Sequence, residues 1–216
     1  MKEITNHEDW LAARLNGIGA SESSAILGMN PYMSNVDLWK IKTGRKKSKD
    51  ISSNDHVSYG HKAEAPLREL FSLDYPHLEV TYLGEFDMVF HPKYPFLFAT
   101  LDGRLLDKST GKKGVYEGKT TEILRSMQKE KWNDQIPQNY YIQVLHQLIV
   151  TGWDFAYLNA QLKRIYKGEP RTEVRRYLFE RDSLLDDMNY LLEKEVEFWE
   201  VNVKQDIEPD LILPDI

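Results

Sequence analysis

The stretch ATLDGRLLDKSTGKKGVYEGKTT, residues 99–121, puts charged side chains where the strands of a buried sheet usually carry apolar ones. Its two apolar segments lead into Asp102 and into Glu117-Gly118-Lys119, and a polar turn joins them. Because side chains alternate along a strand, Glu117 and Lys119 point to the same face. If the two segments pair as a hairpin, Asp102 lies beside Glu117. The stretch therefore predicts two carboxylates and one ammonium on a single surface of a sheet.

This set of two acids and a lysine has a rational chemistry. Two neighbouring carboxylates repel each other unless a positive charge lies between them. Mg²⁺ fits that place because it prefers oxygen ligands, lowers the pKa of a bound water and polarises a phosphoryl oxygen. Lys119 would orient the attacking water or offset charge on the phosphorus. The pattern is compatible with a phosphodiesterase site, but taken alone it is explained better by an ion-pair ladder on a solvated sheet face, because such a pattern often occurs by chance.

The elements on either side of this stretch follow from apolar periodicity and from turn residues. Ser21 is a plausible helix N-cap, and Ser34 with Asp37 has the spacing of a capping box. The order of elements predicts an α/β (α+β) domain around one central sheet. We expect helices at 7–15, 21–27, 34–42, 56–73, 137–151 and 183–203, and strands at 80–90, 96–106, 114–121, 155–162 and 173–179.

Composition limits the class of protein. With 216 residues, 41% of them hydrophobic, the chain is long enough for one domain with one core. The absence of cysteine excludes disulfides, thiolate metal sites, iron–sulfur clusters and cysteine nucleophiles. Apolar runs are too short for a membrane span, and the N-terminus lacks the order of a signal peptide. We therefore expect a cytoplasmic protein with no membrane partner.

The charge distribution leaves two interpretations open. The net charge of −6 argues mildly against a nucleic-acid binder, since DNA affinity depends largely on neutralised phosphates. One segment is nevertheless strongly basic, and it comprises Lys40, Lys42, Arg45, Lys46, Lys47 and Lys49. It is interpreted either as a solvated loop after a helix or as the phosphate-contacting rim of a DNA channel.

A series of short motifs runs through nearly the whole chain. They are Arg14, 17–23 (GIGASES), 25–28 (AILG), 30–32 (NPY), 38–39 (LW), 42–45 (KTGR), Gly60, Glu64, Pro95, 99–103 (ATLDG), 117–121 (EGKTT), 136–137 (IP), Tyr140, Gln143, Gln147 and 198–199 (FW). In this order they resemble the YqaJ-type viral recombinase nucleases, the group that includes lambda exonuclease, within the PD-(D/E)xK superfamily. Each motif is weak alone, but their joint order is highly specific.

The resemblance implies a single domain over 1–216, with a helical part to about residue 75 and a restriction-endonuclease-like core from about residue 76, a mixed sheet flanked by helices. It implies a Mg²⁺-dependent deoxyribonuclease, with Mn²⁺ as a substitute, that digests duplex DNA from 5′ to 3′ and leaves 3′ overhangs for phage-type recombination. It further implies a ring-shaped homotrimer, a single-strand annealing partner, and a phage or prophage protein acting in a bacterial host.

The resemblance also implies roles for individual residues. The metal would be bound by Asp102, Glu117 and the Gly118 carbonyl, with Glu64 helping to hold the metal or its water. Lys119 would be the catalytic lysine, and Gln143 would support that lysine or the nucleophilic water. The 5′-phosphate would be held by Arg14 and Ser21. Glu64 taken alone is better explained as an exposed helix residue, and Ser21 can be a helix cap as well as a phosphate ligand. Gly118 departs from the pattern, because an apolar β-forming residue usually stands there.

Two other functions remain open at this point. A structure-specific or restriction-type endonuclease would use the same core, and it would cut closed circular duplex. A catalytically inactive DNA-binding module would keep the fold but bind no metal. Iron–sulfur exonucleases that share the core are excluded, because the chain has no cysteine.

Overall fold

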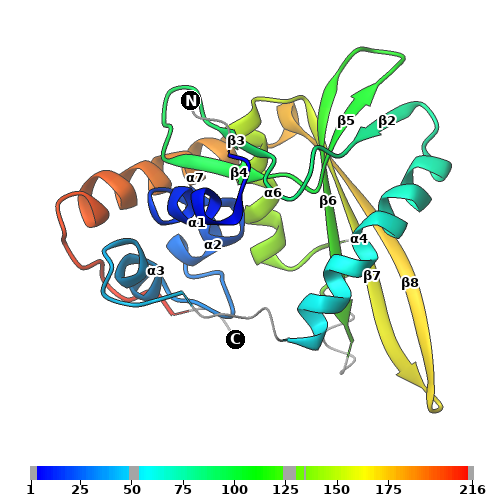
Figure 1. The fold of residues 1–216 in the computed structure, drawn as a ribbon, viewed down its shortest axis with the longest axis horizontal. Coiled ribbons are helices and arrows are strands. Elements are labelled where there is room, and N and C mark those ends of the chain that lie inside the picture. Colours follow the sequence, from blue (N-terminus) through cyan, green and yellow to red (C-terminus); the bar gives the residue numbers. More distant parts are fainter. Residues whose placement is uncertain (1–3, 49–53, 124–129, 134, 214–216) are drawn as a thin grey trace.

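The computed structural model describes residues 4–48, 54–123, 130–133 and 135–213, which form a mixed α/β fold (Figure 1). The N-terminal part is mainly helical, as predicted, with α1 (His7–Leu15), α2 (Ala20–Ile26), α3 (Asn35–Lys42) and α4 (Asp55–Asp74). The C-terminal part ends in α7 (Leu185–Glu197) and a π-helical segment, η2 (Phe198–Val203). None of the helices in the described ranges combines the length and the apolar character needed to cross a bilayer.

The central sheet has five strands in the order β2-β5-β6-β7-β8. They are β2 (Leu78–Thr81), β5 (Gly103–Asp107), β6 (Lys113–Glu122), β7 (Phe155–Tyr166) and β8 (Glu169–Glu180). β6 and β7 run parallel, whereas the other neighbours are antiparallel. A parallel pair needs a crossover, and α6 (Gln138–Thr151) lies in that connection. The sheet is therefore mixed, as the sequence predicts.

Helices cover both faces of this sheet. On one face Leu145 and Leu148 of α6 belong to the larger core cluster, together with Leu158 of β7. On the other face Phe71 of α4 packs edge-on against Tyr116 of β6, with ring centroids 5.1 Å apart. Because side chains alternate along β6, the residue after Tyr116 returns to the α6 face. This alternation determines which helix each polar residue of β6 meets.

A second sheet corrects two of the predicted strands. It has three strands, β1 (Ile18–Gly19), β4 (Leu97–Thr100) and β3 (Met88–Phe90), in the order β1-β4-β3. The segment predicted as one strand at 80–90 splits into β2 and β3, which belong to different sheets. Gly84, with φ of +105°, lies at the interruption, where an L side chain would be strained. The predicted single strand was therefore wrong.

The segment predicted as one strand at 96–106 also splits, into β4 and β5. The interruption falls at Leu101 and Asp102, between the two sheets. Gly103 follows it, and a Cβ there would lie only 3.2 Å from the Cβ of Tyr116. This break matters for the site, because it frees Asp102 from regular ladder pairing.

The predicted helix caps have different outcomes. The hydroxyl of Ser34 accepts from the Asp37 N–H at 3.1 Å, and the Asp37 carboxylate accepts from the Ser34 N–H at 3.4 Å. This capping box is confirmed. The cap predicted at Ser21 is wrong, because α2 starts one residue earlier and its N-cap is Gly19. The Gly19 N–H donates to the Glu22 carboxylate at 3.0 Å, which leaves Ser21 exposed inside the first turn.

Three predicted elements differ in extent. The helix expected at 183–203 divides into a 3₁₀ turn at Arg181–Ser183, α7 and η2. The strands expected at 155–162 and 173–179 are longer, because their pairing continues to Tyr166↔Glu169. β6 accompanies β7 only as far as Glu122↔Lys163, so the end of the β7–β8 hairpin extends past its neighbour. Figure 1 shows this hairpin projecting from the body of the molecule.

Candidate active site

Two acids and a lysine meet at the β5–β6 junction. The last β5–β6 pair is Gly103↔Tyr116, so the next step of the register sets Asp102 beside Glu117. One carboxylate oxygen of Asp102 accepts from the Gly118 N–H at 2.9 Å. Lys119 Nζ lies 2.5 Å from Glu117 Oε1. The structure thus brings together the residues that the sequence predicts on one surface.

Helix α6 presents a polar face to Glu117. Gln143 Nε2 donates to Glu117 Oε1 at 2.6 Å, and Gln147 Nε2 donates to Glu117 Oε2 at 2.5 Å. The ring centroid of Tyr140 lies 5.4 Å from Lys119 Nζ. Gln143 was expected to support the lysine or a water, but its amide contacts the acid. With both oxygens engaged, Glu117 has one fixed orientation and is only 2% exposed.

Sequence reasoning missed one residue of this arrangement and assigned no individual role to a second. The spacing of Gln147 puts it on one helix face with Tyr140 and Gln143, which predicts a polar stripe beside the cleft, but its contact with Glu117 was not predicted. Arg68 was not singled out, yet its guanidinium donates to the Asp102 carbonyl at 3.1 Å. Arg68 follows Glu64 by one turn, and that spacing was the available signal.

Burial and charge set the protonation of the cluster. Burial raises the pKa of Asp102 to about 8, and the neighbouring Glu117 carboxylate adds to the shift. Burial by itself lowers the pKa of Lys119, but Glu117 and Asp102 outweigh it and raise that pKa. Lys119 therefore stays an ammonium and acts as a fixed positive charge, not as a base.

A pocket of about 270 Å³ lies between α4 and β6, next to the cluster. Glu64, Gly118, Lys119 and Thr120 contribute to its wall. Glu64 forms ion pairs with His61 at 3.3 Å and with Arg68 at 4.0 Å. It thus shares a pocket with Gly118 and Lys119, and its role toward a metal or a water stays a prediction.

The donor set fits a hard divalent cation. Within the described ranges, no three His, Asp or Glu side chains gather closely enough to form a metal site by themselves. Mg²⁺ commonly uses one or two carboxylates, keeps several waters and binds substrate phosphates. Asp102 and Glu117 match that mode, and once both carboxyls are ionised their two negative charges face the one ammonium of Lys119. A second positive charge would offset the remaining repulsion.

The residues predicted to hold a 5′-phosphate lie in the N-terminal part. The Arg14 guanidinium stacks 4.8 Å from the Trp10 ring centroid and lies 3.4 Å from the Glu22 carboxylate. Ser21 is exposed on α2, one residue before Glu22. Among the hydrogen bonds and ion pairs of the described residues, none joins Arg14 or Ser21 to Asp102 or Glu117. Their binding of phosphate stays a prediction.

Three of the six cations in the basic segment pair with acids of the chain. Lys42 is buried and bonds to Glu22 at 2.7 Å, which corrects its interpretation as a loop or rim cation. Arg45 pairs with Asp206 at 2.7 Å, and Lys46 pairs with Asp37 at 2.7 Å. Lys49 lies outside the described residues. This segment offers fewer free charges to DNA than its sequence suggests.

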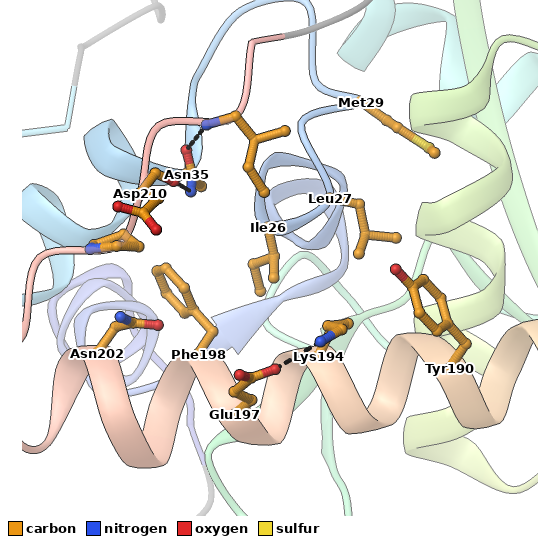
Figure 2. A pocket seen from close by; sticks show the side chains of 12 residues that line it. Ile26, Leu27, Met29, Asn35, Tyr190, Lys194, Glu197, Phe198, Asn202 and Asp210 are labelled. Carbon is orange, nitrogen blue, oxygen red and sulfur yellow. Dashed lines mark hydrogen bonds and ion pairs between the residues drawn. The ribbon is translucent and has the colours of Figure 1, made fainter.

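A larger pocket of about 550 Å³ lies elsewhere, between α2, α7 and the segment after η2 (Figure 2). Lys194 and Glu197 form an ion pair in its wall, with 2.8 Å between the charged atoms, and their side chains are 35% and 56% exposed. Asn35 ties the C-terminal segment down by donating to the Asp210 carbonyl and accepting from the Ile212 N–H. Solvent weakens such an exposed ion pair. Among its described residues, this pocket therefore lacks the buried charges found beside β6, and we place the chemistry at β6.

The unusual Gly118 leads to a prediction. A Cβ at this position would meet no atom closer than 3.6 Å, the distance to the Asp102 carboxylate. Gly118→Ala is therefore expected to fold and to raise the free energy of unfolding by about 0.5–1 kcal/mol, because glycine weakens a strand. Urea unfolding measures this. Gly17→Ala is the matched contrast, since its Cβ would lie 2.4 Å from the Phe96 carbonyl oxygen. A destabilised Gly118→Ala would contradict the geometry.

Comparisons of the sequence point to one family. The family model described as a YqaJ-like viral recombinase domain matches residues 9–154. The chain is also similar to a Bacillus subtilis protein known as uncharacterized protein YqaJ, with 30% identity over 199 residues. That match covers 90% of this chain and 56% of the relative, so the chain spans little more than half of its length.

Comparisons of the structure agree on the fold. The chain is similar to an alkaline exonuclease from Laribacter hongkongensis, with a TM-score of 0.59, 19% identity, and coverage of 93% of this chain and 98% of the other. It is also similar to a phage-related exonuclease from Haemophilus somnus, with a TM-score of 0.53, 11% identity, and coverage of 88% and 96%. At such identities the likeness establishes the fold, and the predicted restriction-endonuclease-like core is confirmed.

Proposed function

Because this chain belongs to the family of YqaJ-like viral recombinase domains, we propose that it is a Mg²⁺-dependent exonuclease acting on duplex DNA. It would digest one strand from 5′ to 3′ and leave a 3′ single strand for recombination. One observation carries the proposal: Asp102, Glu117 and Lys119 converge beside a pocket that adjoins Gly118 and Lys119. Buried acids paired with a fixed ammonium suit phosphodiester hydrolysis better than structural support, since burying them is costly.

The acids, the lysine and the glutamine of the cluster would divide the work. Mg²⁺ or Mn²⁺, when held by Asp102, Glu117 and the Gly118 carbonyl, supplies an activated water and offsets charge on the phosphate. Lys119 would hold the attacking water or stabilise charge that develops at the phosphorus. Gln143 would keep the Glu117 carboxylate in one orientation.

Residues outside β6 would position the reacting groups. Arg68 fixes the chain at Asp102 through the main-chain carbonyl, and Glu64 would hold a metal-bound water from the wall of the adjoining pocket. Arg14 and Ser21 would bind the terminal 5′-phosphate, with the guanidinium already oriented by Trp10. Digestion would then begin at a free DNA end.

The product and the assembly belong to the same proposal. The Laribacter hongkongensis alkaline exonuclease has been solved in complex with dAMP. We propose that mononucleotides are the product of this chain. We also propose a ring-shaped homotrimer and a single-strand annealing partner; light scattering of the purified chain tests the first, and co-purification with that partner tests the second.

The test uses a linear duplex with a labelled 5′-phosphorylated end. We expect Mg²⁺ to release labelled mononucleotides and EDTA to stop their release. A closed circular duplex should survive. Cutting of the circle would instead support an endonuclease, and failure to bind Mg²⁺ in calorimetry, with no effect of Asp102→Asn, would support an inactive DNA-binding module.

Binding of Mg²⁺ is expected to depend on pH. Because the pKa of Asp102 is raised to about 8, this carboxyl holds a proton at neutral pH in the metal-free protein. Binding of a cation must displace that proton, so the apparent affinity should rise with pH and level off above about 8. Calorimetry in buffers of different ionisation enthalpy measures the proton release. Asp102→Asn is the control and should remove the pH dependence; equal affinity at neutral and alkaline pH would contradict the raised pKa.

A further inference from the structure

The end of the β7–β8 hairpin, residues 163–171 with the sequence KRIYKGEPR, has an unusual character. It carries four cationic side chains and one acidic one, on a chain whose net charge is −6. β6 gives it no pairing beyond Lys163, and Ile165 and Tyr166 are 64% and 54% exposed. Neither core cluster contains a residue of this segment, so packing in the core does not account for it, and we call it the hairpin end.

Two arginines lie directly opposite each other in the hairpin end. The β7–β8 register pairs Arg164 with Arg171. Like charges at opposed positions of a sheet destabilise it. Arg171 also lies 3.3 Å from Glu169, but both side chains are more than half exposed, so that pair contributes little. The arrangement lowers the stability of the isolated chain, and an anion bound between the two guanidinium groups would relieve the repulsion.

The hairpin end continues the face of the sheet that carries the active-site lysine. Lys119 of β6 pairs in parallel register with Ala160 of β7, so these two side chains share a face. Every second residue along β7 shares it too, which includes Arg164 and Tyr166. Four residues separate Ala160 from Arg164, about 13 Å at a rise of about 3.3 Å per residue. That length equals about four base pairs of B-DNA.

We propose that the hairpin end binds the phosphate backbone of the duplex substrate, about four base pairs from the bond that is cut. Arg164 and Arg171 would each bind a phosphate through the guanidinium group, and Tyr166, next to the turn of the hairpin, would pack against the DNA. The identity of the ligand rests on the proposed function, whereas the surface itself does not belong to the acid–lysine cluster. A second copy of the chain is the alternative occupant, and the test distinguishes it.

The test measures the binding constant K for a fluorescent duplex of about 30 base pairs, for the wild type and for the double variant Arg164→Gln/Arg171→Gln. The measurement is made in EDTA, at salt concentrations between about 50 and 200 mM. Each lost phosphate contact lowers the slope of log K against log salt by about 0.9, so we expect a loss of about 1.8. KM for digestion should rise while kcat at saturating DNA stays unchanged. Lys112→Gln/Lys113→Gln is the matched control, since it removes two exposed charges at the other end of β6.

Each outcome decides the proposal. A salt slope equal to that of the control would overturn it, and so would an altered particle mass in light scattering, which would assign the surface to self-association. If the double variant fails to fold, Arg164→Gln alone should lose about 0.9 of the slope. Binding is measured in EDTA, without digestion, so it tests the hairpin end independently of the proposed nuclease activity. A wild type that digests no DNA would refute the nuclease, and the salt slope would still show whether the hairpin end binds DNA.

Discussion

Replacing Lys119 by methionine is expected to slow DNA digestion by about 10²–10³-fold, the usual effect of removing one preorganised charged donor. Methionine fills the space of the alkyl chain but lacks the ammonium, which lies 2.5 Å from Glu117 Oε1. Because Glu117 and Asp102 hold the pKa of Lys119 high, the lost group is a permanent positive charge. Release of mononucleotides from an end-labelled duplex under single-turnover conditions measures the rate.

Two further variants separate chemistry from folding. Lys119→Arg keeps the charge and should retain more activity than Lys119→Met, and Lys112→Met removes an exposed lysine and should change nothing. Breaking a buried pair destabilises a protein, so thermal unfolding with and without Mg²⁺ must accompany the rates. Near-normal digestion by a folded Lys119→Met protein would eliminate the assignment of the active site.

The acid–lysine site could be predicted because it depends on local rules. Alternation along one strand sets Glu117 and Lys119 on one face, and a short hairpin brings Asp102 back to them. Local rules also predicted the capping box at Ser34 and α6, which Gly152 ends in a left-handed conformation with φ of 67°. These features require only neighbours in sequence.

Features that depend on distant partners could not be predicted. The strands expected at 80–90 and 96–106 split because each half pairs in a different sheet, and apolar periodicity does not reveal the partner. Ser21 was mistaken for a cap because β1 ends at Gly19, directly before α2, and that strand pairs with the distant β4. The hairpin end was missed because its charges lower its strand propensity, although β7 and β8 pair through it.

The same limit applies to a buried ion pair far from the pocket. His146 of α6 is completely buried between α7 and β4. Its Nδ1 lies 2.6 Å from Glu195 Oε1, and its Nε2 lies 2.8 Å from the Phe98 carbonyl oxygen. A carbonyl only accepts, so Nε2 carries a proton, and a second proton lies between Nδ1 and the carboxylate. His146 follows Gln143 by one turn, so this pair also fixes the helix that holds Glu117.

Glu195→Ala is therefore expected to lower the free energy of unfolding by about 3–5 kcal/mol, because it leaves a buried imidazole without its charge partner. Glu195→Gln should cost less, since an amide oxygen still accepts from Nδ1. Urea unfolding monitored by circular dichroism measures both. Glu197→Ala, two residues along α7 and on a half-exposed side chain, is the control and should change stability little.

The effect of Glu195→Gln is expected to depend on pH in a defined direction. Burial lowers the pKa of His146, but the Glu195 carboxylate outweighs it and raises that pKa above the ordinary value. The stabilisation is then fully present below the unfolded value of about 6.5 and is lost as pH rises through the folded pKa. The difference in unfolding free energy between wild type and Glu195→Gln should thus be larger at about pH 6 than at about pH 9. A difference that stays constant with pH would mean that His146 and Glu195 do not form a charged pair, because only a change in proton binding between the folded and unfolded states makes stability depend on pH.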